Sequence, residues 1–127
     1  MEAYIVEPTK SSPRVEIDFI KRMVEIRGES YPENAVKFYE PVLAKLDELL
    51  ASINTNPLQV NIELRYFNSS SSKILLDLFE RLEDATQDGA SIQVFWIYHP
   101  DDETILECGE GFQEDAMSLD FRLLAKE

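Results

Sequence analysis

Alternating apolar and polar residues predict three strands in the first quarter of the chain. Residues 4–6 form a short apolar run before Pro8, residues 15–19 alternate strictly, and residues 23–26 form another apolar segment that Gly28 is expected to end. Only a few residues separate the second segment from the third, so these two are expected to pair as a hairpin. The first quarter is therefore predicted to be a small β-meander.

From Asn34 onward the apolar period changes to three and four residues, which predicts a long helix with one face toward the core. Pro41 lies inside this pattern and removes one backbone hydrogen bond, so either a kink or a late helix start is expected. Residues 54–57, Asn-Thr-Asn-Pro, are expected to end the helix. The core-facing stripe consists of Ala35, Phe38, Val42, Leu46, Leu49 and Ile53.

Residues 58–66 alternate strictly between apolar and polar side chains, which is typical of a strand covered on one face only. The helices are therefore expected to pack mainly on one face of a mixed sheet. The sequence further predicts a helix over 74–85 that stops near Gly89, a strand near the middle of the sheet over 92–98, a helix over 103–115 and a last strand over 119–124. The predicted order is βββαβαβαβ, a single α/β domain spanning residues 1–127.

The junction between the strand at 58–66 and the following helix carries the most distinctive chemistry, Asn68 followed by four serines and Lys73. It is interpreted as a hydroxyl-rich turn at the positive end of a helix dipole, where a bound or covalently attached phosphate is favoured. From composition alone, a simpler interpretation is that Asn68 or Ser69 caps the helix and that the other serines fill a turn.

Charge excludes two classes of partner. The chain of 127 residues has 12 basic and 25 acidic side chains, a net charge of −13, which phosphate backbones and anionic lipids would repel. It has no apolar run of the roughly 18 residues that a membrane helix needs, and its start lacks the pattern of a secretory signal. The expectation is a cytoplasmic protein that binds neither nucleic acid nor membrane.

The sequence shows no catalytic, metal or cofactor site. Cys108 is the single cysteine, so it can form no intrachain disulfide, and it is expected to be a partly buried apolar residue. His99 with Asp101 and Asp102 matches no metal-ligand spacing and is typical of a turn after a strand. Trp96 belongs to an apolar strand and is expected to pack in the core.

Two motifs together carry a resemblance to a known family. Ser30-Tyr31-Pro32-Glu33-Asn34 precedes the first helix, and the segment from Tyr66 to Lys73 precedes the second. Both resemble the paired signatures of the SiaC-type bacterial regulatory phosphoproteins, and the likeness covers nearly the whole chain, including the acidic segment at 110–115. The resemblance implies a fold like the STAS domains of anti-sigma-factor antagonists (SpoIIAA-like).

The resemblance further implies a phosphorylation switch without enzymatic activity. The unmodified protein would bind and activate a diguanylate cyclase of the GGDEF type, and so control cyclic-di-GMP signalling and biofilm formation. A Ser/Thr kinase would phosphorylate the turn and a PP2C-type phosphatase would reverse it. The acceptor in such proteins is typically a Thr after Asn; here that position is Ser69, with Ser70 and Ser71 as alternatives.

The helix starts indicate where a partner would bind. Successive helices that follow parallel strands begin at one edge of the sheet, so the turn at 31–34 is expected beside Ser69. The expected partner surface consists of Tyr31, Glu33, Asn34, Asn68, Ser70, Ser71 and Lys73.

A second hypothesis is a small phosphate-ligand-binding protein or hydrolase that uses the serines directly. A nucleophilic serine needs a base within reach, and the single histidine follows a different strand. The turn also lacks the glycines of a phosphate-binding P-loop. The regulatory hypothesis is therefore preferred.

Overall fold

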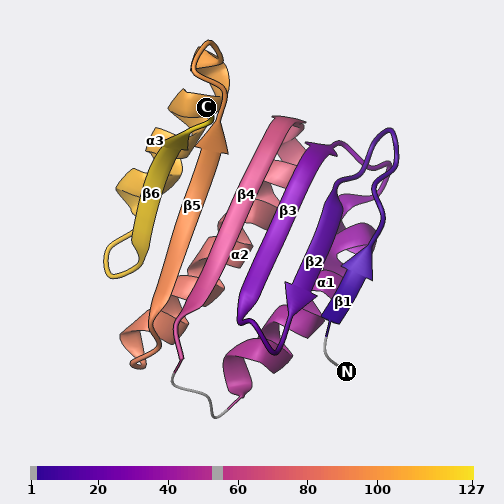
Figure 1. Cartoon of the computed structure of the whole chain (residues 1–127). Helices are drawn as coiled ribbons and strands as arrows, with labels where there is room; N and C mark the ends of the chain where they lie inside the picture. Colours follow the sequence, from indigo (N-terminus) through magenta and orange to yellow (C-terminus); the bar gives the residue numbers. More distant parts are fainter. Residues whose placement is uncertain (1–2, 53–55) are drawn as a thin grey trace.

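Six strands in the described ranges, residues 3–52 and 56–127, form one mixed sheet in this computed structural model. The strands are β1 (Ala3–Val6), β2 (Arg14–Asp18), β3 (Met23–Ser30), β4 (Leu58–Phe67), β5 (Ile92–Tyr98) and β6 (Asp120–Ala125). They lie side by side in the order of the sequence, β1-β2-β3-β4-β5-β6 (Figure 1). The predicted hairpin of β2 and β3 is confirmed.

The sheet changes from antiparallel to parallel at β3. β1 pairs with β2 and β2 with β3 in antiparallel fashion, whereas β3 to β6 are mutually parallel. Each parallel pair therefore requires a crossover, and a helix supplies each one. The expectation that residues 92–98 lie near the middle of the sheet is wrong in part, because β5 is paired on both sides but is second from the edge.

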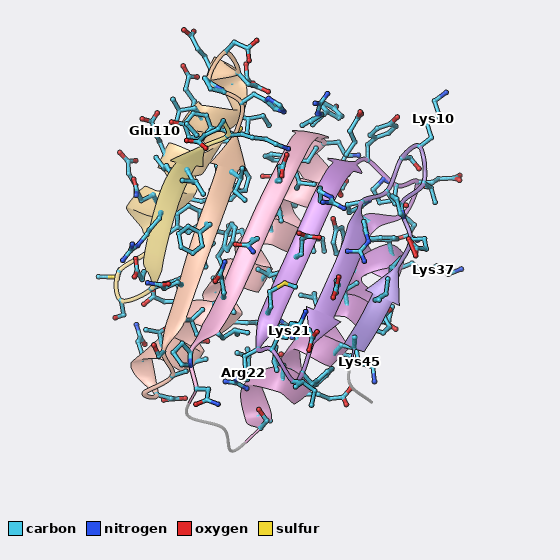
Figure 2. All side chains as sticks on the ribbon, viewed as in Figure 1. Lys10, Lys21, Arg22, Lys37, Lys45 and Glu110 are labelled. Carbon is cyan, nitrogen blue, oxygen red and sulfur yellow. The ribbon has the colours of Figure 1, made fainter. Side chains whose placement is uncertain are left out.

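Three helices in the described ranges, α1 (Ala35–Ala51), α2 (Ser69–Gln87) and α3 (Glu103–Asp115), cover one face of the sheet (Figure 1). The inward residues of the strands are fully buried between sheet and helices, for example Val60, Ile62 and Val94 at 0% exposure. The face turned toward the viewer in Figure 2 carries side chains and no helix. This one-sided cover is the physical reason for the alternation in β4.

α1 begins at Ala35 and continues through Pro41, so the predicted late start is wrong. Asn34 makes the early start favourable, because its side-chain oxygen accepts a hydrogen bond from the Lys37 backbone N–H at 3.0 Å. The kink at Pro41 stays a prediction. The predicted core contact of Ile53 and the predicted helix end at residues 54 and 55 lie outside the described residues.

β3 is longer than its sequence predicts, because the chain passes Gly28 through a β-bulge instead of ending there. Gly28 has φ of +125°, a left-handed conformation that favours glycine, and the register with β4 shifts between Gly28 and Glu29. The bulge carries the strand on to Ser30. This places the Ser30 side chain under the start of α2, where its hydroxyl is 2.8 Å from the Ser71 hydroxyl.

Trp96 of β5 packs against α3 and hydrogen-bonds with it. Its side chain is 0% exposed, and its indole N–H donates to the Ile105 carbonyl at 2.9 Å. Gly109 of α3 packs so closely on this ring that an added Cβ would lie 2.6 Å from Trp96 Nε1. Four phenylalanine rings surround the indole, those of Phe67, Phe79, Phe112 and Phe121.

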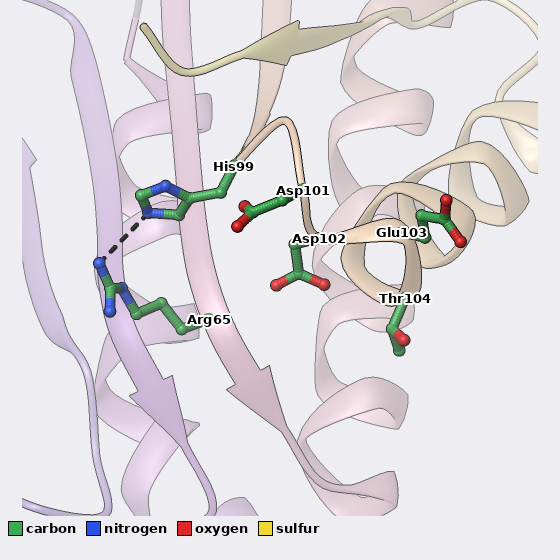
Figure 3. Close-up of a pocket in the computed structure, with 6 residues that line it drawn as sticks. All are labelled: Arg65, His99, Asp101, Asp102, Glu103 and Thr104. Carbon is green, nitrogen blue, oxygen red and sulfur yellow. Dashed lines mark hydrogen bonds between the residues drawn. The ribbon is translucent and has the colours of Figure 1, made fainter.

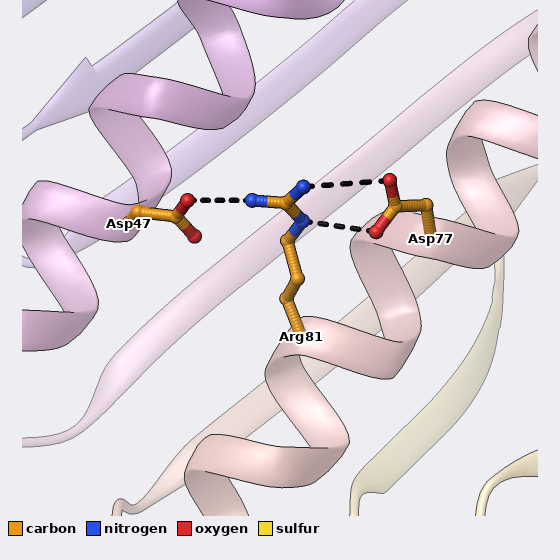
Figure 4. A network of polar contacts seen from close by, with 3 residues as sticks. All are labelled: Asp47, Asp77 and Arg81. Carbon is orange, nitrogen blue, oxygen red and sulfur yellow. Dashed lines mark hydrogen bonds and ion pairs between the residues drawn. The ribbon is translucent and has the colours of Figure 1, made fainter.

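Two carboxylate contacts join the helices to their neighbours. Arg81 of α2 pairs with Asp77 one turn earlier and with Asp47 of α1, which bridges the two helices (Figure 4). Glu83 of α2 accepts hydrogen bonds from three successive backbone N–H groups, those of residues 117, 118 and 119, at 2.9, 2.7 and 3.2 Å. The Glu83 contact holds the loop between α3 and β6 against α2.

Candidate functional site

The starts of all three helices gather at one edge of the sheet, because β3, β4 and β5 are parallel and each leads directly into a helix (Figure 1). The turn at 31–34 and the junction at Asn68 are in direct contact there. The Asn68 backbone N–H donates to the Ser30 carbonyl at 3.1 Å, and the Tyr31 and Tyr66 rings meet edge to face at 5.7 Å. The two family-like motifs are therefore adjacent in space.

The four serines form the first turn of α2 and not a turn ahead of it, which corrects the predicted helix start at residue 74. Asn68 is the cap: its side-chain oxygen accepts a hydrogen bond from the Ser71 N–H at 2.9 Å, and its carbonyl accepts one from the Ser72 N–H at 2.9 Å. Ser69 is thus the first helical residue, at the positive end of the dipole.

The serines differ sharply in access to solvent. Ser69 and Ser70 are exposed, Ser72 is half-buried and Ser71 is fully buried at 0% exposure. The Ser71 hydroxyl hydrogen-bonds with the Ser30 hydroxyl at 2.8 Å. Neither a kinase nor a partner can reach the Ser71 side chain in this conformation, which argues for the two exposed serines as acceptors.

A buried network of three hydroxyls holds the start of α2 on the sheet. Ser30 lies at its centre, 2.6 Å from the Tyr39 hydroxyl of α1 and 2.8 Å from the Ser71 hydroxyl. Burial raises the pKa of Tyr39 to about 12, although its hydrogen bond with Ser30 opposes the increase. No local sequence pattern indicates this network, because the bonded residues are 9 and 41 positions apart along the chain.

The electrostatics of the α2 start favour an anion. Its first turn contains no acidic residue, and Lys73 lies one helical turn after Ser69 on the same side of the helix. Four backbone N–H groups at a helix start have no partner within the helix, and Asn68 satisfies only some of them. A phosphoryl group on Ser69 would therefore sit at the positive end of α2 without replacing an existing carboxylate.

Of the other predicted surface residues, Glu33 and Asn34 are exposed and Tyr31 is half-buried. Glu33 and Asn34 line a shallow hollow with Lys37 and Phe38 at the start of α1. Asn34 also caps α1, so it has a structural role besides any contact with a partner.

The turn after β5 forms a separate polar hollow of about 600 Å³, lined by Arg65, His99, Asp101, Asp102, Glu103 and Thr104 (Figure 3). His99 Nε2 lies 3.3 Å from the Arg65 guanidinium, and Asp102 caps α3 by accepting from the Ile105 N–H at 3.1 Å. Within the described ranges, no three His, Cys, Asp or Glu side chains are grouped to hold a metal ion.

Cys108 is half-buried, as its sequence context predicts. Burial raises the pKa of its thiol, and the negative charges of Glu107 and Asp102 raise it further. The reactive form of cysteine is the thiolate, so these surroundings make Cys108 a poor nucleophile.

Fold and site together define a small α/β protein with exposed hydroxyls at an anion-favouring helix start. A model of the SiaC family of regulatory phosphoproteins matches residues 6–126, and the chain belongs to this family. It is 33% identical over 107 residues to an uncharacterised protein of Pseudomonas aeruginosa strain UCBPP-PA14. The aligned residues make up 84% of each of the two chains.

Solved structures from Pseudomonas aeruginosa show the same fold. The crystal structure of apo-SiaC is 30% identical with a TM-score of 0.87, and the match covers 98% of this chain and 100% of that one. A chain in the crystal structure of the diguanylate cyclase SiaD in complex with its activator SiaC is 31% identical with a TM-score of 0.91. The match covers 97% of the present chain and 99% of that one. Among the described helices of the present chain, none has the length and apolar character to cross a membrane.

Proposed function

We propose that this protein is a non-enzymatic switch that binds and activates a diguanylate cyclase while Ser69 is unmodified. The observation that carries the proposal is the exposed hydroxyl of Ser69 at the capped start of α2, in a chain of the SiaC family. The Pseudomonas aeruginosa relative supports the choice of partner, because that SiaC is the activator of the cyclase SiaD in their complex.

In this proposal a Ser/Thr kinase transfers the γ-phosphoryl group of ATP to Ser69 Oγ, the hydroxyl proton leaves and ADP is released. A PP2C-type phosphatase hydrolyses the ester and returns serine and phosphate. Both ATP and the GTP that a cyclase consumes are cytoplasmic, so the protein acts in the cytoplasm as one domain over residues 1–127. We also classify the fold as STAS-like, with the helices on one face and the switch residue at the start of α2.

Burial and helix geometry favour Ser69 over the other serines. Ser71 is buried and engaged with Ser30, which leaves Ser69 and Ser70 as the exposed hydroxyls. Ser69 is the residue after Asn68, and Lys73 stands four residues after it, where the ammonium can neutralise part of the phosphate charge.

The same geometry supports the absence of catalysis. The one histidine, His99, lies beyond the end of β5, where its Nε2 is 3.3 Å from the Arg65 guanidinium, so the ring contacts Arg65 and not a serine of α2. The serine hydroxyl is therefore a substrate for another enzyme and not a nucleophile of this one.

The test compares cyclase affinity of unmodified and kinase-treated protein by calorimetry, with cyclic-di-GMP synthesis as the activity measurement. SiaD is a defined first probe, followed by the diguanylate cyclases of the native host. A phosphate dianion in a surface that a partner must desolvate commonly costs about 2–5 kcal/mol, which is roughly 30-fold to several-thousandfold in affinity.

Ser69→Ala should bind and activate constitutively, and Ser69→Asp should bind weakly. Ser70→Ala is the matched control, because this neighbouring serine is also exposed, and it should retain phosphorylation. Equal affinity of the two phosphoforms, or phosphate found only on another serine, would contradict the proposal.

A further inference from the structure

The four consecutive serines from Ser69 to Ser72 create a problem of specificity for a switch that uses one of them. A kinase at the start of α2 meets several similar hydroxyls close together, and helix ends open more readily than helix interiors. The local sequence hardly distinguishes these residues, because each has a serine as a neighbour. A distinction between them must therefore come from the tertiary structure around the first turn of α2.

Ser30 of β3 holds this turn at two points. Its carbonyl accepts a hydrogen bond from the backbone N–H of the cap residue Asn68 at 3.1 Å, and its hydroxyl lies 2.8 Å from the Ser71 hydroxyl. The Tyr39 hydroxyl, 2.6 Å from Ser30 Oγ, holds that hydroxyl from the other side. The side chains of Ser30, Tyr39 and Ser71 are all 0% exposed. The start of α2 is thus attached through Ser30 to β3 and, through Tyr39, to α1.

Packing alone does not require a hydroxyl at position 71. Ser71 begins the buried stripe of α2, which continues with Leu75, Leu78 and Leu82. An apolar side chain would suit the first position of that stripe too, because a buried hydroxyl is costly unless it is bonded. Hydrogen bonds are directional and apolar contacts are not, so the hydroxyl fixes the rotation of the turn as well as its burial.

The rotation of the first turn decides which hydroxyl faces outward. Successive residues of an α-helix lie about 100° apart around its axis, so Ser69 faces nearly opposite to Ser71. Because the Ser71 hydroxyl is held inside, the Ser69 hydroxyl is turned outward. The burial of the two side chains agrees with this, since Ser69 is exposed and Ser71 is fully buried. Ser70 is exposed at an intermediate rotation.

We infer that Ser30 is a positioning residue that makes Ser69 the phosphate acceptor among the four serines, with Tyr39 holding the Ser30 hydroxyl in place. This inference rests on the proposed function and assigns the choice of acceptor to buried residues that the kinase does not contact. The network keeps the first turn closed, so the kinase meets Ser69 in one orientation while Ser71 stays inside. Opening of the turn frees Ser70 and Ser71 to compete.

The test removes the hydrogen bonds of Ser30 stepwise and maps the phosphate by mass spectrometry after treatment with ATP and the kinase that serves to test the proposed function. Tyr39→Phe removes one bond and keeps the ring, whereas Ser30→Ala removes both side-chain bonds. The share of phosphate on Ser70 and Ser71 should rise about fivefold in Tyr39→Phe, the usual weight of one hydrogen bond, and further in Ser30→Ala. Tyr98→Phe, at a half-buried tyrosine of β5, is the matched control and should keep phosphate on Ser69 alone.

A second measurement follows the first turn without a kinase. The backbone N–H groups of Ser71 and Ser72 are bonded to Asn68, so their hydrogen exchange, measured by NMR, reports opening of the turn. Exchange at these two amides should be about fivefold faster in Tyr39→Phe and faster still in Ser30→Ala. The control variant should exchange like the unsubstituted protein, and equal exchange in all variants would overturn the inference.

The site of the phosphate separates positioning from a loss of stability, provided that each variant is treated well below its midpoint of thermal unfolding. A purely structural role of Ser30 would lower that midpoint and leave the phosphate on Ser69 in every variant; the proposed function would then survive and the inference would be refuted. Phosphate spread over several serines of the unsubstituted protein would refute it too. If the kinase modifies no serine of α2, the proposed function fails and this inference fails with it.

Discussion

The exchange Gly109→Ala tests whether the contact between α3 and Trp96 limits the choice of residue at position 109. A Cβ at this position would lie 2.6 Å from Trp96 Nε1 and 2.9 Å from Leu123 Cδ2, closer than real Cβ atoms approach other atoms. The indole cannot easily move aside, because its N–H donates to the Ile105 carbonyl and phenylalanine rings surround it. Either α3 or the ring must shift.

The expected free energy follows from three opposing effects. Alanine favours the helix over glycine by about 1 kcal/mol, overpacking costs about 1–3 kcal/mol, and loss of the indole hydrogen bond costs about 0.5–1.5 kcal/mol. The net effect is a destabilisation of about 0.5–3.5 kcal/mol. For a domain of this size, the midpoint of thermal unfolding should fall by about 2–14 °C.

The assay is urea denaturation followed by the fluorescence of Trp96, the single tryptophan, with thermal unfolding as a second measurement. Gly111→Ala is the control, because it makes the same exchange in the same helix where an added Cβ meets nothing within 4 Å. It should stabilise by up to about 1 kcal/mol. If Gly109→Ala is as stable as Gly111→Ala, the packing argument is refuted.

Two further predictions concern titrating groups. Burial raises the pKa of Glu83, but hydrogen bonds from residues 117–119 outweigh it and hold that pKa below its ordinary value of 4.5. Its stabilisation is therefore present above that pH and lost as the pH falls, so the urea midpoints of the unsubstituted protein and Glu83→Gln should differ at pH 7 and converge in acid; a constant difference would contradict this. The pKa of Tyr39 is raised from 10 to about 12, so the stabilisation by the neutral phenol is fully present below about pH 10 and is lost as the pH rises to about 12. Ultraviolet titration should show one late tyrosine that is absent in Tyr39→Phe; simultaneous titration of all five would contradict it.

Periodicity predicted the elements well because burial has a regular spacing in each of them. The alternation over residues 58–66 matches β4 closely, since every second side chain faces the helices. The position of β5 was harder to predict, because an apolar run is typical of any strand with neighbours on both sides. Gly28 was misleading, since a glycine can end a strand or form a bulge within one.

The location of the candidate site could be predicted from the sequence, but the buried hydrogen bonds that hold the start of α2 in place could not. The motif made Ser69 the candidate acceptor, and parallel strands implied that the turn at 31–34 would lie beside the start of α2, as it does. The burial of Ser71 and its bond to Ser30 depend on two distant segments meeting, which no local pattern encodes. The close packing of Gly109 on Trp96 likewise required the structure, because only the space around each glycine distinguishes Gly109 from Gly111.

The anchoring of α2 determines how the proposed phosphorylation can act. Asn68 caps the helix, and Ser71 joins it to Ser30 and, through Ser30, to Tyr39 of α1. These bonds lie beneath the first turn, while the Ser69 side chain is exposed above it. A dianion added to Ser69 is stabilised by the helix dipole and breaks none of them. The signal must therefore be read from the charge and hydration of the surface, and a partner that senses it has to contact the first turn of α2 directly.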